Sequence, residues 1–266
     1  MGCDGMIGKL IGKGNTAEVI AVGDGKVVKL FNRGYPLDSV CKEFENSKLL
    51  HGLELPTVKS YEMVTYEGRN GILYDRIDGE SMLDILLHTE DYEKYANTLA
   101  KLQKQMLACK LGGAVSLKFI LKRNIEYTDH LSMPNKAKLI NMLDSLPDGD
   151  CFCHGDFHFG NVIIEQEQNY IIDYMNVCRG HEYGDIARTV YLIEMTPVPA
   201  AQIHNTERIL FMKKQATDIY LQEIGVNREC LSEWLLVTAA ARLSELSNEQ
   251  TDEKNSVLEY LSKQGL

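Results

Sequence analysis

The chain has 266 residues, is 44% hydrophobic and 25% charged, and carries a formal net charge of -10. This length and composition favour a folded globular protein with one large domain or two lobes, and they exclude disordered and collagen-like chains. A nucleic-acid-binding surface is not expected, because such a surface would normally be basic. The negative charge is compatible with cationic ligands, although acidic surfaces also serve solubility.

Cysteine usage and apolar stretches bear on the compartment. The seven cysteines are scattered without the spacing of zinc ligands, so we expect free thiols in a reducing cytoplasm. The first ten residues lack the apolar region of a secretory signal, and Met6 stands where an N-acylation motif needs Ser or Thr. The longest apolar stretch, 234–241, is too short to span a bilayer. We expect a cytoplasmic protein without a membrane partner; its oligomeric state is not visible in the sequence.

The first 77 residues are predicted to be mostly strands. Apolar runs separated by Gly and Asp occur at 18–22, 27–31 and 72–74. One helix interrupts them and is expected to end by Gly52, with Asp38 or Ser39 as its cap. This region is predicted to form a small β-rich lobe, followed by a hinge near 74–80.

Residues 78–266 are predicted to form a larger, helical lobe. A buried helical stripe is indicated by apolar residues at three- and four-residue spacing, namely Tyr92, Tyr95, Leu99, Leu102 and Met106. A second helix is expected from Pro134 to just before Pro147, and helical patterns resume at Asp185. A single hairpin, 162–164 with 170–172, interrupts the helices. The expected fold class is therefore α+β, with two lobes.

The hairpin is flanked by polar residues that suggest a metal site. Asp156 and Asn161 precede its first strand and Asp173 follows its second, so strand pairing should bring all three to one edge. Mg²⁺ prefers a few carboxylate or amide oxygens, here Asn161 and Asp173, and leaves positions for phosphate and water. Asp156 would remain to orient a hydroxyl and accept its proton, as phosphoryl transfer requires. Alone, each of these residues would favour a turn role, because Asp and Asn are common in turns.

A glycine-bearing segment upstream could hold a nucleotide. Gly12 and Gly14 lie between strand-like runs, where backbone N–H groups can approach phosphates without a Cβ in the way. Ala17 stands at the third glycine position of the usual loop, and Val19 is placed to pack over a purine. Without further support, the same residues would form an ordinary hairpin turn.

Support comes from Lys29, which lies inside an apolar strand. A buried, unpaired ammonium group is costly, so Lys29 should meet an anion, such as the α- and β-phosphates of ATP. A carboxylate on the following helix would fix the lysine. Glu43 is the predicted partner and Glu45 the alternative.

With these residues the chain resembles the aminoglycoside phosphotransferase and choline kinase family of protein-kinase-like small-molecule kinases. The resemblance covers roughly residues 7–195. It rests on G-K-G-N-T-A-E-V at 12–19, Lys29, I-L-Y-D-R-I-D-G at 72–79, H-G-D-F-H-F-G-N at 154–161, I-I-D-Y at 171–174 and G-D-I-A-R at 184–188. Glycine after the histidine, where protein kinases usually have arginine, is similar to the small-molecule branch.

The resemblance implies a role for each matching residue. Asp156 would be the catalytic aspartate, Asn161 and Asp173 the magnesium ligands, and Lys29 the phosphate-binding lysine paired with Glu43. The segment from Asp75 to Ile77 would be the hinge that hydrogen-bonds the purine through its backbone. His154 and His158 would brace the loop, and Asp185 would cap the next helix.

The sequence therefore predicts an ATP- and Mg²⁺-dependent kinase that phosphorylates a hydroxyl of a small molecule, with a cationic aminoglycoside or amino alcohol as a candidate acceptor. The tail after about 200 matches no known pattern, and its acidic residues, such as Glu245 and Glu253, are expected to form a solvated face. Two alternatives stay open: a kinase of a protein or glycated protein, and a nucleotide-binding regulatory protein that has lost catalysis. ATP and GTP are not distinguished.

Overall fold

The computed structural model describes residues 8–198 and 204–266, which form two compact units. The first unit contains the described residues up to Asp84 together with Gly160–Asn176, and the second contains the rest. The sequence predicts a single boundary at 77/78 instead. The contacts divide the chain differently because the segment after 160 returns to pair with a short strand near residue 80.

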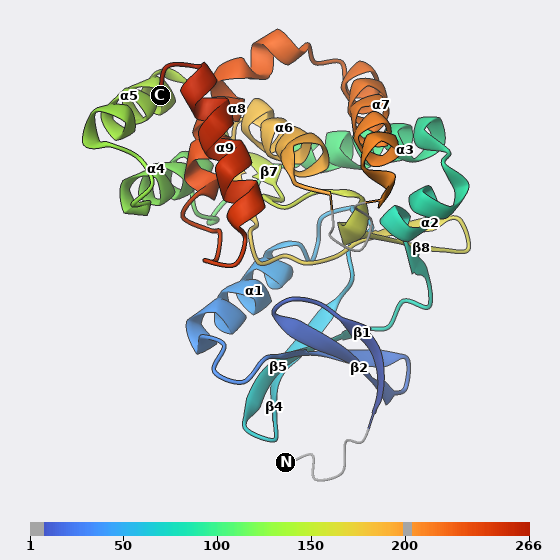
Figure 1. Cartoon of the computed structure of the whole chain (residues 1–266). Coiled ribbons are helices and arrows are strands. Elements are labelled where there is room, and N and C mark those ends of the chain that lie inside the picture. The colour runs from blue at the N-terminus through green and yellow to red at the C-terminus, as the bar shows by residue number, and fades with distance from the viewer. Residues whose placement is uncertain (1–7, 199–203) are drawn as a thin grey trace. The chain divides into compact units, whose positions relative to one another are not determined.

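Five antiparallel strands form the main sheet of the first unit, in the order β1-β2-β3-β5-β4 (Figure 1). The strands are β1 (Lys9–Lys13), β2 (Ala17–Gly23), β3 (Lys26–Phe31), β4 (Ser60–Tyr66) and β5 (Arg69–Asp75). Helix α1 (Leu37–Leu49) packs on β4 and β5. Val28, Leu30, Val40 and Ile72 are almost fully buried and form the core of this unit.

Helix α1 lies where the sequence predicts a helix, but it begins earlier. Pro36 is the residue that precedes its first turn, and no side chain caps it. The expected cap at Asp38 or Ser39 is therefore wrong. Proline is favourable near a helix start because its φ is already close to the helical value and it has no N–H to satisfy.

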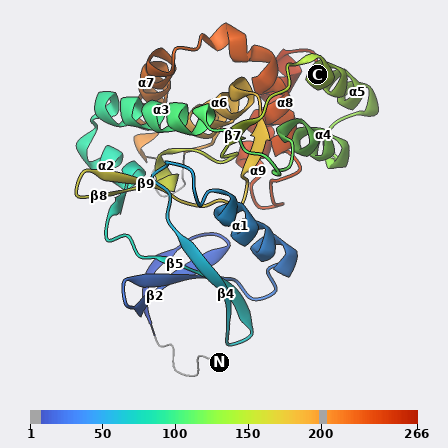
Figure 2. The ribbon, with the colours of Figure 1, turned by 180° about the vertical axis from the view of Figure 1, so that it is seen from behind.

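The predicted hairpin is confirmed and belongs to a second sheet of the first unit, in the order β6-β8-β9. The strands are β6 (Glu80–Ser81), β8 (Val162–Glu165) and β9 (Gln168–Ile171) (Figure 2). Gln166 and Glu167 form a two-residue turn and both have positive φ, 49° and 71°. Such turns match the right-handed twist of the paired strands and place the residues after β9 beside those before β8.

The second unit is mostly helical. After α2 (Met82–Thr89), which starts in the first unit, its helices are α3 (Tyr92–Ala108), α4 (Leu117–Tyr127), α5 (Met133–Ser145), α6 (Glu182–Val190), α7 (Thr206–Ile224), α8 (Ser232–Arg242) and α9 (Thr251–Lys263). Short 3-10 segments occur at Phe159–Asn161 and Arg228–Leu231, and a π-helical turn at Tyr191–Met195 extends α6. In the described parts of the chain, no helix is long and apolar enough to cross a membrane.

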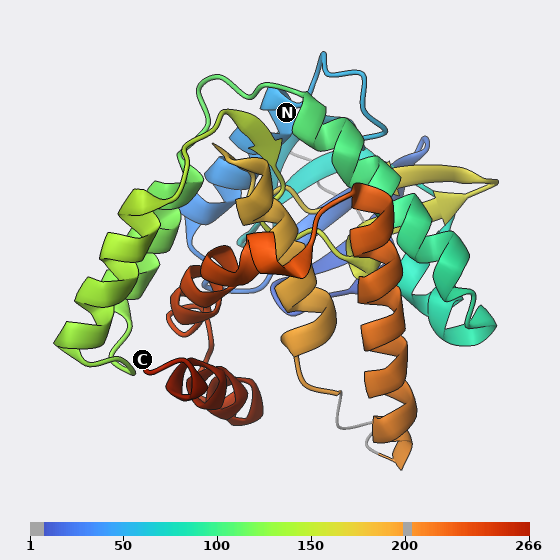
Figure 3. The ribbon, with the colours of Figure 1, turned by 90° about the horizontal axis from the view of Figure 1, so that it is seen from above.

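The helices of this unit pack in small groups. Helix α3 lies against α7, and α4, α5 and α8 pack on one another (Figure 3). The predicted stripe on α3 is buried at Tyr95, Leu99, Leu102 and Met106, and α5 occupies the predicted 134–147 segment. A two-stranded sheet pairs β7 (Cys151–Cys153) with β10 (Cys178–Gly180) and leads directly into the H-G-D segment.

Candidate active site

Lys29 lies on β3, and two carboxylates of the first unit share its ammonium group. Nζ lies 2.7 and 2.9 Å from the carboxylate oxygens of Glu43 and 3.1 Å from Oδ1 of Asp173. Glu43 comes from α1 and is 1% exposed, whereas Glu45 is exposed. The pairing left open in the sequence is therefore made by Glu43. Asp173 as a second partner was not foreseen.

The charges of this cluster are strongly coupled. Burial by itself would lower the pKa of Lys29, but the charges of Glu43 and Asp173 outweigh it and raise that pKa. Burial raises the pKa of Glu43, and the attraction of Lys29 offsets this only in part. The Tyr74 hydroxyl donates to Oε1 of Glu43 (3.1 Å) and helps to hold it. One lysine beside two carboxylates leaves a formal charge of about -1, which a bound cation can neutralise.

Asn161 and Asp173 meet at the base of the β8–β9 hairpin. Val162 pairs with Ile171, and the Ile172 N–H donates to the Asn161 carbonyl oxygen (3.0 Å), so the residue before Asp173 is fixed beside Asn161. Asp173 has a φ of 67°, which is uncommon for a residue with a side chain and is found disproportionately at functional sites.

These two residues fit a magnesium site that is completed by a ligand. Residues 8–198 and 204–266 contain no group of three or more His, Cys, Asp or Glu that could hold a metal by themselves. Mg²⁺ usually takes only one or two protein carboxylates together with phosphate oxygens and water. One amide and one carboxylate at the hairpin base meet that requirement.

The predicted glycine segment forms the tight turn between β1 and β2. The Gly14 N–H donates to the Ala17 carbonyl oxygen (2.9 Å), which leaves Asn15 and Thr16 as the turn residues. Asn32 braces the turn: its side-chain amide donates to the Asn15 carbonyl (2.9 Å) and its N–H to the Thr16 carbonyl (2.8 Å). The sequence does not reveal this brace because Asn32 lies beyond the next two strands, β2 and β3.

Gly12 and Val19 place the turn in register with the lysine. Gly12 pairs with Val19 across β1 and β2, and Val19 pairs with Lys29 across β2 and β3. Ala17, at the position of the missing third glycine, is 3% exposed. The sheet therefore connects the turn to Lys29 through direct strand pairing.

The segment predicted as a purine-binding hinge follows the end of β5. The Asp75 N–H donates to the Lys59 carbonyl oxygen (3.0 Å), and its carboxylate accepts from the Tyr61 hydroxyl (2.9 Å) and pairs with Lys26. The N–H of Arg76 is also engaged, with the Gly25 carbonyl (2.8 Å). No described residue accepts a hydrogen bond from the N–H of Ile77.

In the second unit, the loop after β7 carries Asp156 and is held by a hydrogen bond to Asp185. Gly155 has a φ of 75°, and its N–H donates to Oδ1 of Asp185 (2.8 Å). The Gln103 amide donates to the other oxygen of Asp185 (2.8 Å), and Asp185 is fully buried. Burial raises the pKa of Asp185, and these hydrogen bonds oppose the shift. The expected capping role is wrong: His181 caps α6, and Asp185 braces the loop.

Asp156 lies between two potential cations of the second unit. Its Oδ1 is 3.9 Å from Nη2 of Arg188, and its Oδ2 is 3.9 Å from Nε2 of His158. The Asp156 side chain is 26% exposed, so an incoming group can reach it. His154 is fully buried.

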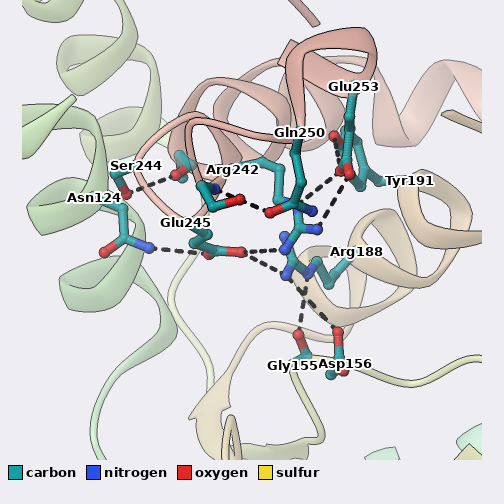
Figure 4. Close-up of polar contacts among 12 residues, drawn as sticks. Asn124, Gly155, Asp156, Arg188, Tyr191, Arg242, Ser244, Glu245, Gln250 and Glu253 are labelled. Carbon is teal, nitrogen blue, oxygen red and sulfur yellow. Dashed lines mark hydrogen bonds and ion pairs between the residues drawn. The ribbon is translucent and has the colours of Figure 1, made fainter. Parts of the chain in front are cut away.

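The acidic residues of the tail take part in a network of ion pairs, and one of them, Glu253, is buried. Glu253 is 5% exposed and accepts from Arg242 (2.8 Å), and Glu245 accepts from Arg188 (2.7 Å) and Arg242 (3.0 Å) (Figure 4). The expectation fails for Glu253, which is buried. Glu245 is exposed as expected, but its carboxylate pairs with arginines of α6 and α8. Trp234 is buried on the His181 ring, with centroids 6.0 Å apart.

Solved structures of similar fold cover nearly the whole chain. A thermostable mutant of aminoglycoside phosphotransferase APH(4)-Ia, in ternary complex with AMP-PNP and hygromycin B, superimposes with a TM-score of 0.69 at 11% identity, covering 97% of this chain and 92% of that one. Amicoumacin kinase hAmiN, in complex with AMP-PNP, Ca²⁺ and Ami, gives 0.63 at 12% identity, with coverages of 97% and 88%. A putative fructosamine-3-kinase from Haemophilus somnus 129PT gives 0.61 at 11% identity, with coverages of 95% and 90%.

These likenesses confirm the predicted α+β, protein-kinase-like fold. No curated protein sequence is significantly similar to the chain. The model of the phosphotransferase enzyme family matches residues 7–215, which is more than half of the chain. The chain therefore belongs to the phosphotransferase enzyme family and is a phosphotransferase.

Proposed function

We propose that the chain transfers the γ-phosphoryl group of ATP to a hydroxyl of a small molecule in the presence of Mg²⁺. The observation that carries this proposal is the partly buried Lys29 shared by Glu43 and Asp173, one from α1 and one from the hairpin base. A purely structural ion pair needs one carboxylate for one lysine. The second carboxylate suits a site in which a metal and phosphates complete the charge balance.

The nucleotide would be held by the first unit. Lys29 would donate to the α- and β-phosphates, with Glu43 fixing its position, and the turn between Gly12 and Val19 would cover the phosphates. At the proposed hinge, Ile77 would donate its N–H to the purine and Asp75 would support the segment through its bonds to Lys26 and Tyr61. Complexes of the structural neighbours with AMP-PNP support a nucleoside triphosphate as the phosphoryl donor.

Asn161 and Asp173 would hold the Mg²⁺ ion. The bound ion would supply charge neutralisation at the phosphate oxygens, which is a large part of catalysis in phosphoryl transfer. Asp156 precedes Asn161 by five residues in the chain. We assign to Asp156 the orientation of the acceptor hydroxyl and the acceptance of its proton as the oxygen attacks the γ-phosphorus.

The acceptor class is proposed from charge and likeness. The net charge of -10 suits a cationic molecule such as an aminoglycoside or an amino alcohol. Two structural neighbours, APH(4)-Ia and APH(2'')-IIa, were solved in complex with hygromycin B and with streptomycin. The neighbour named as a fructosamine-3-kinase favours a second class, a fructosamine, free or on a glycated protein. A regulatory protein without catalysis would not need Lys29, Asp156 and Asp173 together.

The test is Mg²⁺-dependent release of ADP from ATP against a panel of aminoglycosides, choline, ethanolamine, homoserine, fructosamines and simple sugars, with GTP as an alternative donor. We expect one acceptor class to stimulate release. Asp156→Ala should bind Mg-ATP nearly as wild type and lose about two to four orders of magnitude in turnover, the scale of a lost acid/base group. Undiminished turnover in Asp156→Ala would remove Asp156 from the mechanism.

A further inference from the structure

Arg188 connects the loop that carries Asp156 to the turn that follows α8. Arg188 lies on α6 and is 8% exposed. Its Nε donates to the Gly155 carbonyl oxygen (3.1 Å), and its Nη2 donates to Oε2 of Glu245 (2.7 Å). The same Nη2 lies 3.9 Å from Oδ1 of Asp156, which is an ion pair at a distance too long for a hydrogen bond (Figure 4).

The buried guanidinium of Arg188 needs a negatively charged partner, and Glu245 is the closer of its two carboxylate partners. A guanidinium removed from water is costly unless a carboxylate with good geometry faces it. Glu245 is more than 1 Å closer to Nη2 than Asp156 is. Arg188 is therefore anchored by Glu245 and does not depend on a hydrogen bond to Asp156, whose carboxylate can act on another partner.

Neighbouring polar and charged side chains hold Glu245 in place. Its Oε1 accepts from the Asn124 amide (3.0 Å), and its Oε2 also accepts from Arg242 (3.0 Å). Arg242 donates to Glu253, which also accepts from the Tyr191 hydroxyl (2.9 Å). Partial desolvation would raise the pKa of Glu245, whose side chain is 30% exposed, but the charges of Arg188 and Arg242 outweigh it and lower that pKa. Glu245 therefore stays ionised at neutral pH.

We propose that Arg188 is a positioning residue for Asp156 and that Glu245 acts through Arg188. The planar guanidinium fork joins three points, the Gly155 carbonyl, Glu245 and the Asp156 carboxylate, so that a shift of one end moves the loop. Glu245, Arg242 and Glu253 all lie beyond the matched segment 7–215. A part of the chain outside the family match thus completes the catalytic loop. This inference rests on the proposed role of Asp156.

The test compares full-length Arg188→Gln, Arg188→Lys, Glu245→Gln and the double Gln variant with a matched control. Arg228→Gln is the control, because Arg228 also bridges two carboxylates in the same unit, Glu194 and Asp218 at 2.8 Å each, and touches nothing in the loop. Initial rates of ADP release are measured with Mg-ATP and water, and with the panel compound that stimulates most.

Arg188→Gln should lower kcat by about 10- to 100-fold, the scale of a catalytic group displaced by roughly 1 Å, with KM for Mg-ATP within about twofold of wild type. Arg188→Lys should recover part of kcat, because lysine restores the charge without the fork. Glu245→Gln should lower kcat less than Arg188→Gln does. The double variant should be no slower than Arg188→Gln, because both changes disrupt the same interaction between Arg188 and Glu245. Arg228→Gln should keep wild-type kcat.

The inference is overturned if the kcat of Arg188→Gln equals that of Arg228→Gln, or if the effects of the Arg188 and Glu245 substitutions on kcat are additive in free energy. Asp156→Ala is run in parallel: if it keeps turnover, the proposed function fails, and if it loses turnover while Arg188→Gln does not, only this inference fails. Hydrogen exchange of the 154–158 amides gives a result even without turnover. Exchange should be faster in Arg188→Gln and Glu245→Gln than in wild type and Arg228→Gln, and equal rates would contradict the proposal.

Discussion

At the scale of single residues, Lys29 shows how far the sequence leads. A lysine within an apolar strand requires an anion, and this reasoning correctly predicts a glutamate on the following helix. It does not predict Asp173, which lies 144 residues away and reaches Lys29 only because the hairpin returns to the first unit. Side-chain chemistry therefore predicts that Lys29 has an anionic partner, and the fold is needed to identify both of its carboxylates.

Replacing Lys29 by methionine should abolish the stabilisation of the protein by Mg-ATP. A ligand at 100 times its Kd raises the free energy of unfolding by about 2.7 kcal/mol, and the lysine supplies the phosphate contact on which this binding is proposed to depend. The measurement is thermal unfolding with and without Mg-ATP. Lys26→Met is the control, since Lys26 lies on the same strand and pairs with Asp75. A wild-type increase in Tm for Lys29→Met would exclude the lysine from the nucleotide site.

Lys213 should make stability depend on pH in the alkaline range. Burial lowers its pKa from 10.5 to about 8, and its ammonium donates to Thr196. Between these two values the unfolded chain binds more protons than the folded one, so the stability of wild type relative to Lys213→Met should rise as the pH increases from about 8 to about 10. Urea unfolding of both proteins across this range measures the difference. A constant difference would show that Lys213 titrates normally.

At the scale of elements, strong periodic patterns were predictive and short or weakly patterned helices were not. The α3 stripe carries a clear period of 3.6, the β8–β9 hairpin consists of two short apolar runs around a polar turn, and both lie where predicted. Helices α2 and α4 were missed; α2 has only eight residues, and in α4 only Leu117, Leu121, Asn124 and Ile125 are buried. Their helical state depends on packing, which the local pattern does not contain.

Gly79→Ala should destabilise the small sheet that carries Asp173. A Cβ at Gly79 would lie 2.3 Å from the Ile164 carbonyl oxygen and 2.8 Å from Cγ2 of Ile163, so backbone must move. We expect a loss of about 1 to 3 kcal/mol, as for other overpacked sites. Gly112→Ala is the control because no atom lies within 4 Å of its added Cβ. Equal urea midpoints for both variants would contradict the tight approach of Gly79 to β8.

At the scale of the whole molecule, the sequence predicted the fold class but not how the chain divides. A single boundary at 77/78 cannot describe a first unit that includes Gly160–Asn176. The same limit applies to the network of Arg188 and Glu245, whose members are 57 residues apart and carry no shared motif. Contacts between distant segments are decided by packing, and one sequence shows residue types without those contacts.

The central claim is transfer of phosphate to a hydroxyl group. Its most direct measurement is ³¹P NMR of a reaction containing the protein, Mg²⁺, ATP and the stimulating acceptor, with Asp156→Asn in parallel. We expect a phosphate monoester signal that grows with that of ADP in wild type and grows about two to four orders of magnitude more slowly in Asp156→Asn. ADP formed together with inorganic phosphate alone, or the same monoester at the same rate in both proteins, would contradict it.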